Sequence, residues 1–134
     1  IEKANEYLGY PFSITGTVVS GEKLGHTIGY PTANIALSET YKLIPKTGAY
    51  LIRSYIDGNA AYGMMNIGNR PTVNGTKKTI EVHFFDFNEE IYGHEIKIEM
   101  LKRLRDERKF DSIDLLRKQL NKDKKEALDY IQSV

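Results

Sequence analysis

The first hundred or so residues alternate between short runs of β-branched and aromatic residues and breaks of Gly, Pro, Asn and Asp, which is typical of strands joined by turns. Five runs are long enough for strands: residues 12–21, 48–57, 60–68, 79–87 and 95–103. Asp57, Gly58 and Asn59 separate two of them and tolerate positive φ, which predicts a tight hairpin. The residues around Gly93 predict a second hairpin, between 79–87 and 95–103.

After Asp111 the period changes, and apolar residues recur every three or four positions with charged residues between them. These apolar residues are Ile113, Leu116, Leu120, Ala127, Leu128 and Ile131. Asp111 or Ser112 can cap this amphipathic helix, while Asn121 predicts a break and residues 123–126 a second helix start. Residues 2–8 predict a short helix. Consecutive strands followed by a helix favour an antiparallel barrel or sandwich with a helix packed on it.

Composition adds limits to this picture. The 134 residues fit one compact domain, and the absence of cysteine excludes disulfides and thiolate zinc sites, so a reducing cytoplasm is the expected compartment. No apolar run approaches the roughly 20 residues that cross a bilayer, and the start lacks the apolar segment of a signal peptide, so no membrane partner is expected. Because the chain starts at Ile1, a fragment or a processed chain is expected.

The net charge of +1 is unevenly distributed. Residues 97–125 hold eleven Lys and Arg against six Asp and Glu, a local charge of +5 that leaves −4 for the rest of the chain. Such a tract can face nucleic acid, an anionic small molecule or water, and the interleaved acids favour a solvated face.

Candidate chemistry begins in the glycine-rich segment 21–29. It does not match a P-loop, because three residues instead of four separate Gly21 from Gly25 and His26 stands in the lysine position. Gly21, Gly25 and Gly29 still allow backbone N–H groups to turn toward one ligand, although an ordinary hairpin loop explains the same residues.

The stretch "PTAN" follows this segment. Pro31 fixes its own φ and disfavours helix before it, so Thr32 and Asn34 are expected in an extended chain with their side chains on one side. Their oxygens can then face one hard cation such as Mg²⁺, which keeps water and phosphate oxygens as its other ligands. Local hydrogen bonds within a turn are the competing interpretation.

The run "TIEVHFFDF" places a carboxylate and an imidazole on one side of a strand. Period two divides it into Ile80, Val82 and Phe84 on one face and Glu81, His83 and Phe85 on the other. If the second face lines a cleft, Glu81 can act as a general base and His83 can hold it or pack beside a ligand. If that face is solvated, Glu81 is an ordinary strand charge.

Two further polar segments are candidates. Turn formation explains most of "NIGNRPT" at 66–72, although Arg70, Lys77 and Lys78 could reach an anion. The segment 103–112 is either a solvated loop or a lid that clamps a flat ligand with Arg105 and Phe110.

In combination, these motifs resemble riboflavin kinase, the flavokinase module of bacterial bifunctional riboflavin kinase/FAD synthetases. The resemblance covers nearly the whole chain and is carried by "YLGYPFSITGTVVSG", "LGHTIGYPTANI", "TGAYL", "NIGNRPT", "IEVHFFDF", "IYG" and "LRDERKFDSIDLLRKQLNKD". It implies a single kinase domain over 1–134: a lead-in of 1–10, a six-stranded antiparallel Greek-key barrel over about 11–105, and a C-terminal helical segment over about 111–132 packed on it.

The resemblance also implies an ATP-dependent phosphotransferase that converts riboflavin to FMN. The implied catalytic base is Glu81, and the implied Mg²⁺ positions are Thr32 and Asn34. The implied ATP site consists of Gly21, His26, Thr27, Thr32 and Asn34, and the implied flavin site of Glu81, Arg105, Glu107 and Phe110. Members of the family usually carry Arg or Lys in place of His26, which is largely neutral near pH 7, so a weaker phosphate contact or a charge from Lys23 is expected.

An N-terminal FAD synthetase domain is an expected partner in a longer protein, and because this chain has no H-x-G-H motif it is expected to make FMN and not FAD. One alternative is a barrel that binds single-stranded nucleic acid, although the nine tyrosines are dispersed along the chain. Another is a barrel that binds flavin without catalysis, which the presence of Glu81, Thr32 and Asn34 disfavours.

Overall fold

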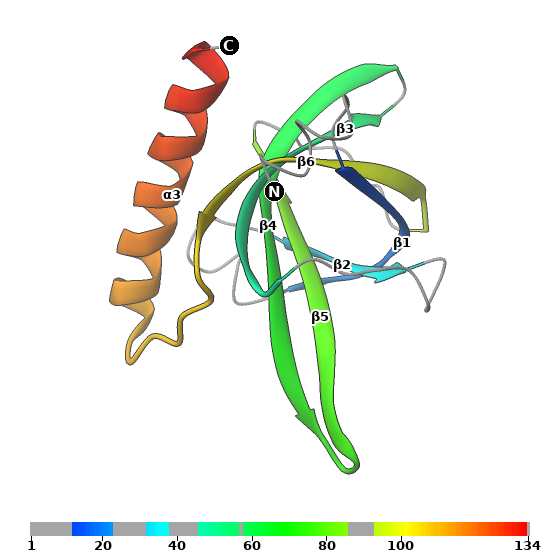
Figure 1. The fold of residues 1–134 in the computed structure, drawn as a ribbon, viewed down its shortest axis with the longest axis vertical. Helices are drawn as coiled ribbons and strands as arrows, with labels where there is room; N and C mark the ends of the chain where they lie inside the picture. Colours follow the sequence, from blue (N-terminus) through cyan, green and yellow to red (C-terminus); the bar gives the residue numbers. More distant parts are fainter. Residues whose placement is uncertain (1–11, 23–31, 38–45, 57, 86–92, 134) are drawn as a thin grey trace.

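The computed structural model describes residues 12–22, 32–37, 46–56, 58–85 and 93–133. Its elements are the strands β1 (Phe12–Glu22), β2 (Thr32–Leu37), β3 (Gly48–Ile56), β4 (Asn59–Thr72), β5 (Gly75–Phe84) and β6 (Glu95–Arg105), and the helix α3 (Ile113–Ser133). Figure 1 shows the strands curving into a barrel with α3 standing beside it. The short helix expected at 2–8 lies outside the described residues.

The strands form a closed antiparallel barrel in the order β1-β2-β5-β4-β3-β6. Strands β3, β4 and β5 follow one another as neighbours, and β6 returns to the open side of β3, which is the Greek-key arrangement. The six-stranded Greek-key barrel implied by the resemblance to riboflavin kinase is therefore confirmed, and β2 is the strand that the five predicted runs did not include.

The hairpin predicted around Gly93 is wrong, because β6 pairs with β1 and β3 and not with β5. Both edges of β5 are already occupied, by β2 and β4, so β5 has no edge left for β6. The hairpin predicted at 57–59 is confirmed. Ile56 pairs with Asn59, and Gly58 adopts a φ of 84° that glycine accepts without a steric penalty.

The hairpin of β4 and β5 is longer than its sequence suggests. The predicted strand 60–68 extends to Thr72, through residues for which a turn explained most of the composition, and the turn falls at Val73 and Asn74. Pairing of β4 with β3 stops at Ile67, so the outer part of the hairpin pairs only with itself and Pro71 removes no hydrogen bond to β3. Figure 1 shows this ribbon reaching beyond the rest of the barrel.

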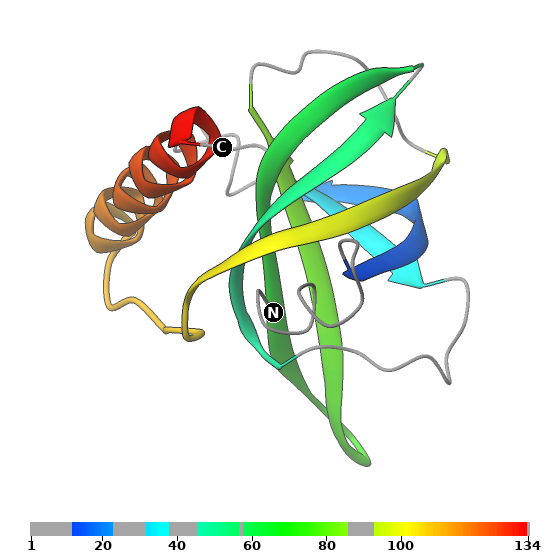
Figure 2. The same cartoon turned by 45° about the horizontal axis from the view of Figure 1, so that its top comes forward.

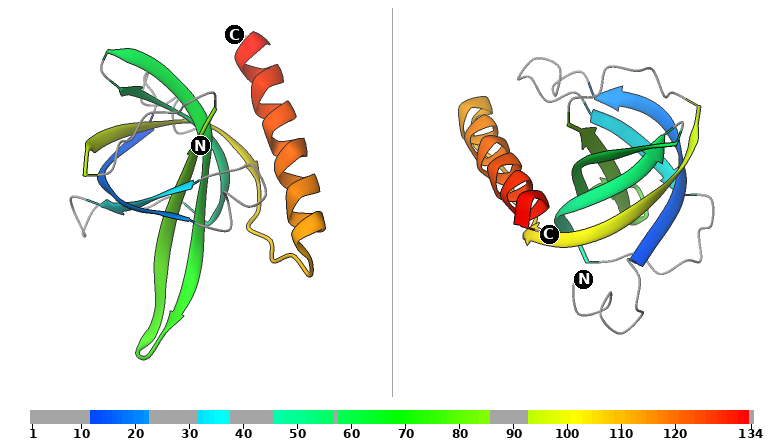
Figure 3. Two further views of the ribbon diagram at one scale, coloured as in Figure 1. Left: turned by 180° about the vertical axis from the view of Figure 1, so that it is seen from behind. Right: turned by 90° about the horizontal axis from the view of Figure 1, so that it is seen from above.

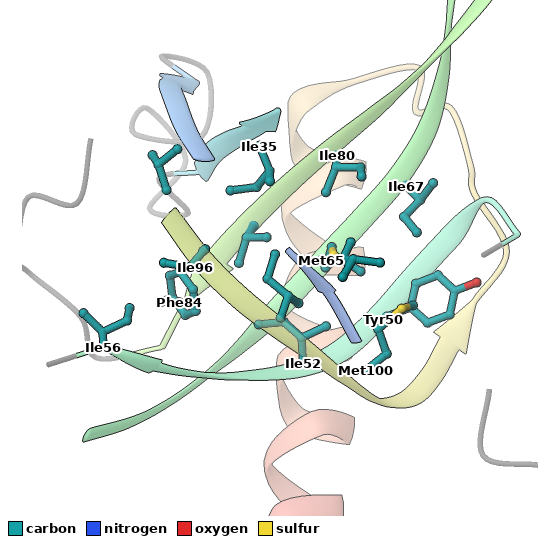
Figure 4. Packing of buried hydrophobic residues seen from close by; sticks show 14 residues of the cluster. Ile35, Tyr50, Ile52, Ile56, Met65, Ile67, Ile80, Phe84, Ile96 and Met100 are labelled. Carbon is teal, nitrogen blue, oxygen red and sulfur yellow. The ribbon is translucent and has the colours of Figure 1, made fainter. Parts of the chain in front are cut away.

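The barrel interior is a continuous apolar core, seen at close range in Figure 4. Its buried members are Ile14, Val18, Ile35, Tyr50, Ile52, Ile56, Met65, Ile67, Ile80, Val82, Phe84, Ile96, Ile98 and Met100. The predicted division of this strand into two faces is confirmed for residues 80–84, and the structure shows that the face of Ile80, Val82 and Phe84 points into the core. Glu81 and His83 therefore lie on the outer face.

Helix α3 lies outside the ring of strands, as Figures 2 and 3 show from different sides. It closes a second apolar cluster, in which Ala127 is fully buried. The other buried members of this cluster are Leu51 of β3, Met64 of β4 and Phe85, which follows the end of β5. No helix in the described part of the chain has the length and apolar character to cross a membrane.

The Ser112 cap is confirmed, because its Oγ accepts a hydrogen bond from the Leu115 N–H at 3.2 Å. The predicted break at Asn121 is wrong, since α3 continues unbroken to Ser133. Asp123 does not start a second helix because its side chain is engaged by Arg105. Ile113 and Leu128, assigned to the apolar face, are exposed at 47% and 36%.

Candidate functional site

The strand register brings two separately predicted residues together. Asn34 of β2 lies directly opposite Glu81 of β5. Residues opposite one another in antiparallel strands share a face, with Cβ atoms roughly 4.5–5.5 Å apart. Both side chains are partly buried, and their neighbours Ile35 and Ile80 point into the core. Asn34 and Glu81 therefore form one polar pair on the outer face of the barrel.

The remaining predicted phosphate-site residues lie close to this pair in the register, as far as they are described. Thr32 is the first residue of β2 and pairs with Glu22, while Gly21 pairs with Ala33. The extended conformation expected for 32–34 is confirmed. His26 and Thr27 fall outside the described residues, so their placement stays a prediction.

A third polar residue, Asn66 of β4, forms a row with Asn34 and Glu81 across three neighbouring strands. Glu81 lies opposite Asn66 as well as Asn34, so β5 carries its carboxylate between two amide side chains. Asn66 carries no clear functional signal in the sequence, because "NIGNRPT" has the composition of a turn. Only the pairing of β4 with β5 reveals that Asn66 faces the predicted base.

Glu107 reaches the same face from the segment after β6. A Cβ atom placed on Gly68 would lie 2.5 Å from Glu107 Oε1 and 3.3 Å from Asn66 Nδ2. The missing side chain at Gly68 therefore leaves the space in which the Glu107 carboxylate rests. Because Asn66 and Gly68 are two residues apart on β4, Glu107 and Asn66 stand on one side of the sheet.

Arg105 is engaged in holding α3 to the barrel. Its Nε donates to both carboxylate oxygens of Asp123, at 2.9 and 3.1 Å, and Asp123 is only 2% exposed. Gln119 adds a third hydrogen bond to Asp123 at 2.8 Å. Sequence reasoning missed Asp123, which has the residue type of a helix cap and finds its partner 18 positions earlier. The predicted contact of Arg105 with a flat ligand stays a prediction.

Phe110 packs against two guanidinium groups. The Arg105 and Arg108 guanidinium carbons lie 5.7 and 5.4 Å from its ring centroid, a distance suited to cation–π attraction. Arg108 also donates to Gln119 of α3 at 3.0 Å. The segment between β6 and α3, interpreted from the sequence as a solvated loop or a lid, is thus tied to the helix.

His83 packs by its ring edge. Its ring centroid lies 5.9 Å from that of Phe85, with the ring planes at 72°, so His83 lies between Glu81 and the apolar cluster beneath α3.

Asp106 lies in the segment after β6. A 2.7 Å hydrogen bond from Arg103 is the main cause that lowers the pKa of the Asp106 carboxyl, and the charges of Arg103 and Lys46 lower it further. Within the described ranges, no group of three or more His, Cys, Asp or Glu side chains is placed to hold a metal ion.

The closed antiparallel barrel carries a carboxylate between two amide side chains on its outer face. A carboxylate can accept the proton of a hydroxyl group, which is one of the functions that phosphoryl transfer to an alcohol uses. The chain belongs to the riboflavin kinase family. The family model described as "Flavokinase: Riboflavin kinase" matches residues 8–131.

Three curated relatives are named bifunctional riboflavin kinase/FMN adenylyltransferase. The chain is 45% identical to the Bacillus subtilis (strain 168) protein over 100% of this chain and 43% of the relative. It is 40% identical to the Haemophilus influenzae protein over 99% of this chain and 43% of the relative. It is 39% identical to the Escherichia coli (strain K12) protein over 95% of this chain and 40% of the relative. The chain thus spans about two fifths of the length of these relatives.

A solved structure with a different name has a similar fold. It is described as a macrolide-efflux protein from Streptococcus pneumoniae. The TM-score is 0.87 at 38% sequence identity, and the match covers 93% of this chain and 41% of that one. The barrel and its helix are therefore shared with a part of a longer protein.

Proposed function

We propose that this chain transfers the γ-phosphate of ATP to the 5′-hydroxyl of riboflavin, which yields FMN and ADP. The observation that carries the proposal is the placement of Glu81 directly opposite Asn34 on the outer face of a barrel of the riboflavin kinase family. The curated relatives also bear an adenylyltransferase name, and the chain spans about two fifths of them. We assign only the kinase step to these residues, with the adenylyltransferase part as an expected neighbour in a longer protein.

In the proposed mechanism Glu81 orients the 5′-hydroxyl and accepts its proton. The hydroxyl oxygen forms the new bond to the γ-phosphorus, and the bond from that phosphorus to the β–γ bridging oxygen breaks, with its electron pair leaving on ADP. Phosphoryl transfer of this kind depends on positioning and charge neutralisation more than on covalent chemistry by the protein. A carboxylate held in the sheet suits this role, because a strand fixes its position.

The side-chain oxygens of Thr32 and Asn34 have the chemistry to bind a magnesium ion. Thr32 and Asn34 would hold the ion, since hydroxyl and amide oxygens are hard ligands of the kind that Mg²⁺ accepts alongside water and phosphate oxygens. When bound, the ion would neutralise charge on the ATP phosphates. Gly21, His26 and Thr27 are the proposed further ATP contacts, and Arg105, Glu107 and Phe110 the proposed flavin contacts beside Glu81.

Replacing Asn34 by alanine is expected to raise the Mg²⁺ concentration that gives half-maximal rate by about tenfold, because one of two protein ligands is lost. The measurement is a Mg²⁺ titration of FMN formation at fixed ATP. Asn69→Ala, an exposed asparagine of β4, serves as the control and should leave the titration unchanged. Equal Mg²⁺ requirements in Asn34→Ala and the wild type would exclude Asn34 as a ligand.

Gly68→Ala is expected to raise the KM for riboflavin about three- to tenfold, the order of one weakened hydrogen bond. The added methyl would lie 2.5 Å from Glu107 Oε1 and would displace that carboxylate. Its backbone needs no positive φ at this position, so the folded state is expected to persist. A riboflavin KM equal to that of the wild type would show that the Glu107 carboxylate makes no contact with the flavin.

The proposed function is tested by incubating the chain with riboflavin, ATP and Mg²⁺ and separating the products by liquid chromatography. We expect FMN and ADP to form in equal amounts. The matched control is 5′-deoxyriboflavin, which lacks the acceptor hydroxyl and should give neither product. Failure of the folded chain to form FMN from riboflavin would refute the proposal.

A further inference from the structure

Asn66 occupies the position next to the proposed base on the side away from Asn34. In the register it lies between Glu81 of β5 and Ala49 of β3. Ala49 offers only a methyl group and is 4% exposed, so the polar neighbour of Asn66 across the sheet is Glu81. Residues opposite one another in this way have Cβ atoms roughly 5 Å apart, which is within the reach of an amide and a carboxylate.

The Asn66 amide and the Glu107 carboxylate also lie over the same residue of β4. Asn66 Nδ2 and Glu107 Oε1 both lie over Gly68, at 3.3 and 2.5 Å from the point where a Cβ atom would stand. The amide therefore stands where carboxylates approach from two sides, Glu81 from β5 and Glu107 from the segment before α3. An amide nitrogen carries two N–H donors, one for each of two acceptors.

The type of residue at position 66 affects how well the neighbouring Glu81 can act as a base. Two carboxylates on one face repel each other, and a group between them must satisfy both. A lysine or arginine would do so, but its positive charge would lower the pKa of the base and weaken it as a proton acceptor. A neutral amide can hold a carboxylate by hydrogen bonding without a full opposing charge. Asn34 faces Glu81 from the other side but has its own proposed task at the metal and the phosphates.

We propose that Asn66 is a positioning residue that orients the Glu81 carboxylate toward the acceptor hydroxyl and holds Glu107 at the same site; this rests on the proposed role of Glu81. Asn66 acts through these two groups and does not itself touch the reacting atoms. Its loss is expected to lower kcat and to raise the KM for riboflavin, while the KM for ATP stays within about twofold of the wild type. Loosening of the whole sheet would instead raise both KM values.

The experiment compares Asn66→Ala, Asn66→Asp and Asn66→Ser with the wild type in steady-state FMN formation. Asn66→Ala is expected to lower kcat about 10- to 100-fold, the order of one hydrogen bond to a charged group. The nearly isosteric Asn66→Asp should lose at least as much, because it removes the donors and adds a third carboxylate. Asn66→Ser, which keeps one donor, should retain more activity than either.

Asn69→Ala and Asn69→Asp are the matched controls, since Asn69 is an exposed asparagine on the same strand. Both are expected to keep wild-type kcat, and thermal unfolding of every variant checks that the fold persists. Wild-type kcat in Asn66→Asp would overturn the inference, as would equal losses in Asn66→Ser and Asn66→Ala or a rise in the KM for ATP as large as that for riboflavin. Absence of FMN formation by the wild type would instead refute the proposed function itself.

Discussion

Replacing Glu81 by glutamine is expected to lower the turnover of FMN formation about 10²- to 10⁴-fold, the usual contribution of a general base. Glutamine keeps the size of the side chain and its place opposite Asn34 and Asn66, but it cannot accept the proton of the hydroxyl. The KM values for riboflavin and ATP should change little, because the loss lies in the transition state. Initial rates at saturating substrate give the comparison directly.

The control is Glu95→Gln, which alters an exposed glutamate at the start of β6. Its turnover should match the wild type. Full activity of Glu81→Gln would remove Glu81 from the mechanism, and a large rise in both KM values with unchanged turnover would make it a binding residue only.

Asp123→Ala is expected to lower the free energy of unfolding by about 3 kcal/mol, the lower end of the range for breaking a buried ion pair. The substitution leaves the Arg105 guanidinium, whose side chain is 16% exposed, without the carboxylate that it contacts at 2.9 Å. The loss of this contact removes an ion pair between β6 and α3, and the substitution also removes the acceptor of the Gln119 hydrogen bond within α3. Urea unfolding followed by circular dichroism measures the change.

Asp129→Ala is the matched control, because Asp129 is an exposed aspartate of the same helix. It should cost less than about 0.5 kcal/mol. The double variant Arg105→Met, Asp123→Leu should recover most of the loss, since apolar side chains of similar volume replace a buried pair at little cost. If Asp123→Ala were no less stable than Asp129→Ala, the ion pair would not hold the helix.

Sequence patterns predict the elements well where interactions between residues close in the sequence determine the structure. The tight hairpin after β3 follows from Gly58 and its neighbours, and the division of β5 into two faces follows from the alternation of residues 80–84, although only the fold shows which face is buried. The false hairpin between β5 and β6 shows the limit. Whether two successive strands pair depends on which edges other strands leave free, and that is fixed by contacts distant in the sequence.

The candidate site likewise contains residues that the sequence indicates and contacts that only the fold reveals. Residue type and strand period make Glu81 and Asn34 candidates, and the resemblance to riboflavin kinase implies their roles, but their adjacency depends on the register of β2 against β5. Asn66 lies where the predicted strand 60–68 overlaps a segment whose glycine, asparagine and proline content favours a turn, and only the register of β4 against β5 places it opposite Glu81. Asp123 looked like a cap because short acidic side chains serve both caps and ion pairs, and only its buried contact with Arg105 distinguishes them.

The most direct test of the account is a crystal structure of the chain with riboflavin, Mg²⁺ and a non-hydrolysable ATP analogue. We predict that the 5′-oxygen of riboflavin lies within hydrogen-bond reach of the Glu81 carboxylate, about 2.6–3.2 Å, and faces the γ-phosphorus of the analogue. We also predict that the metal ion lies beside Asn34. A bound flavin whose 5′-oxygen is directed away from the Asn34, Glu81 and Asn66 row would contradict the central claim.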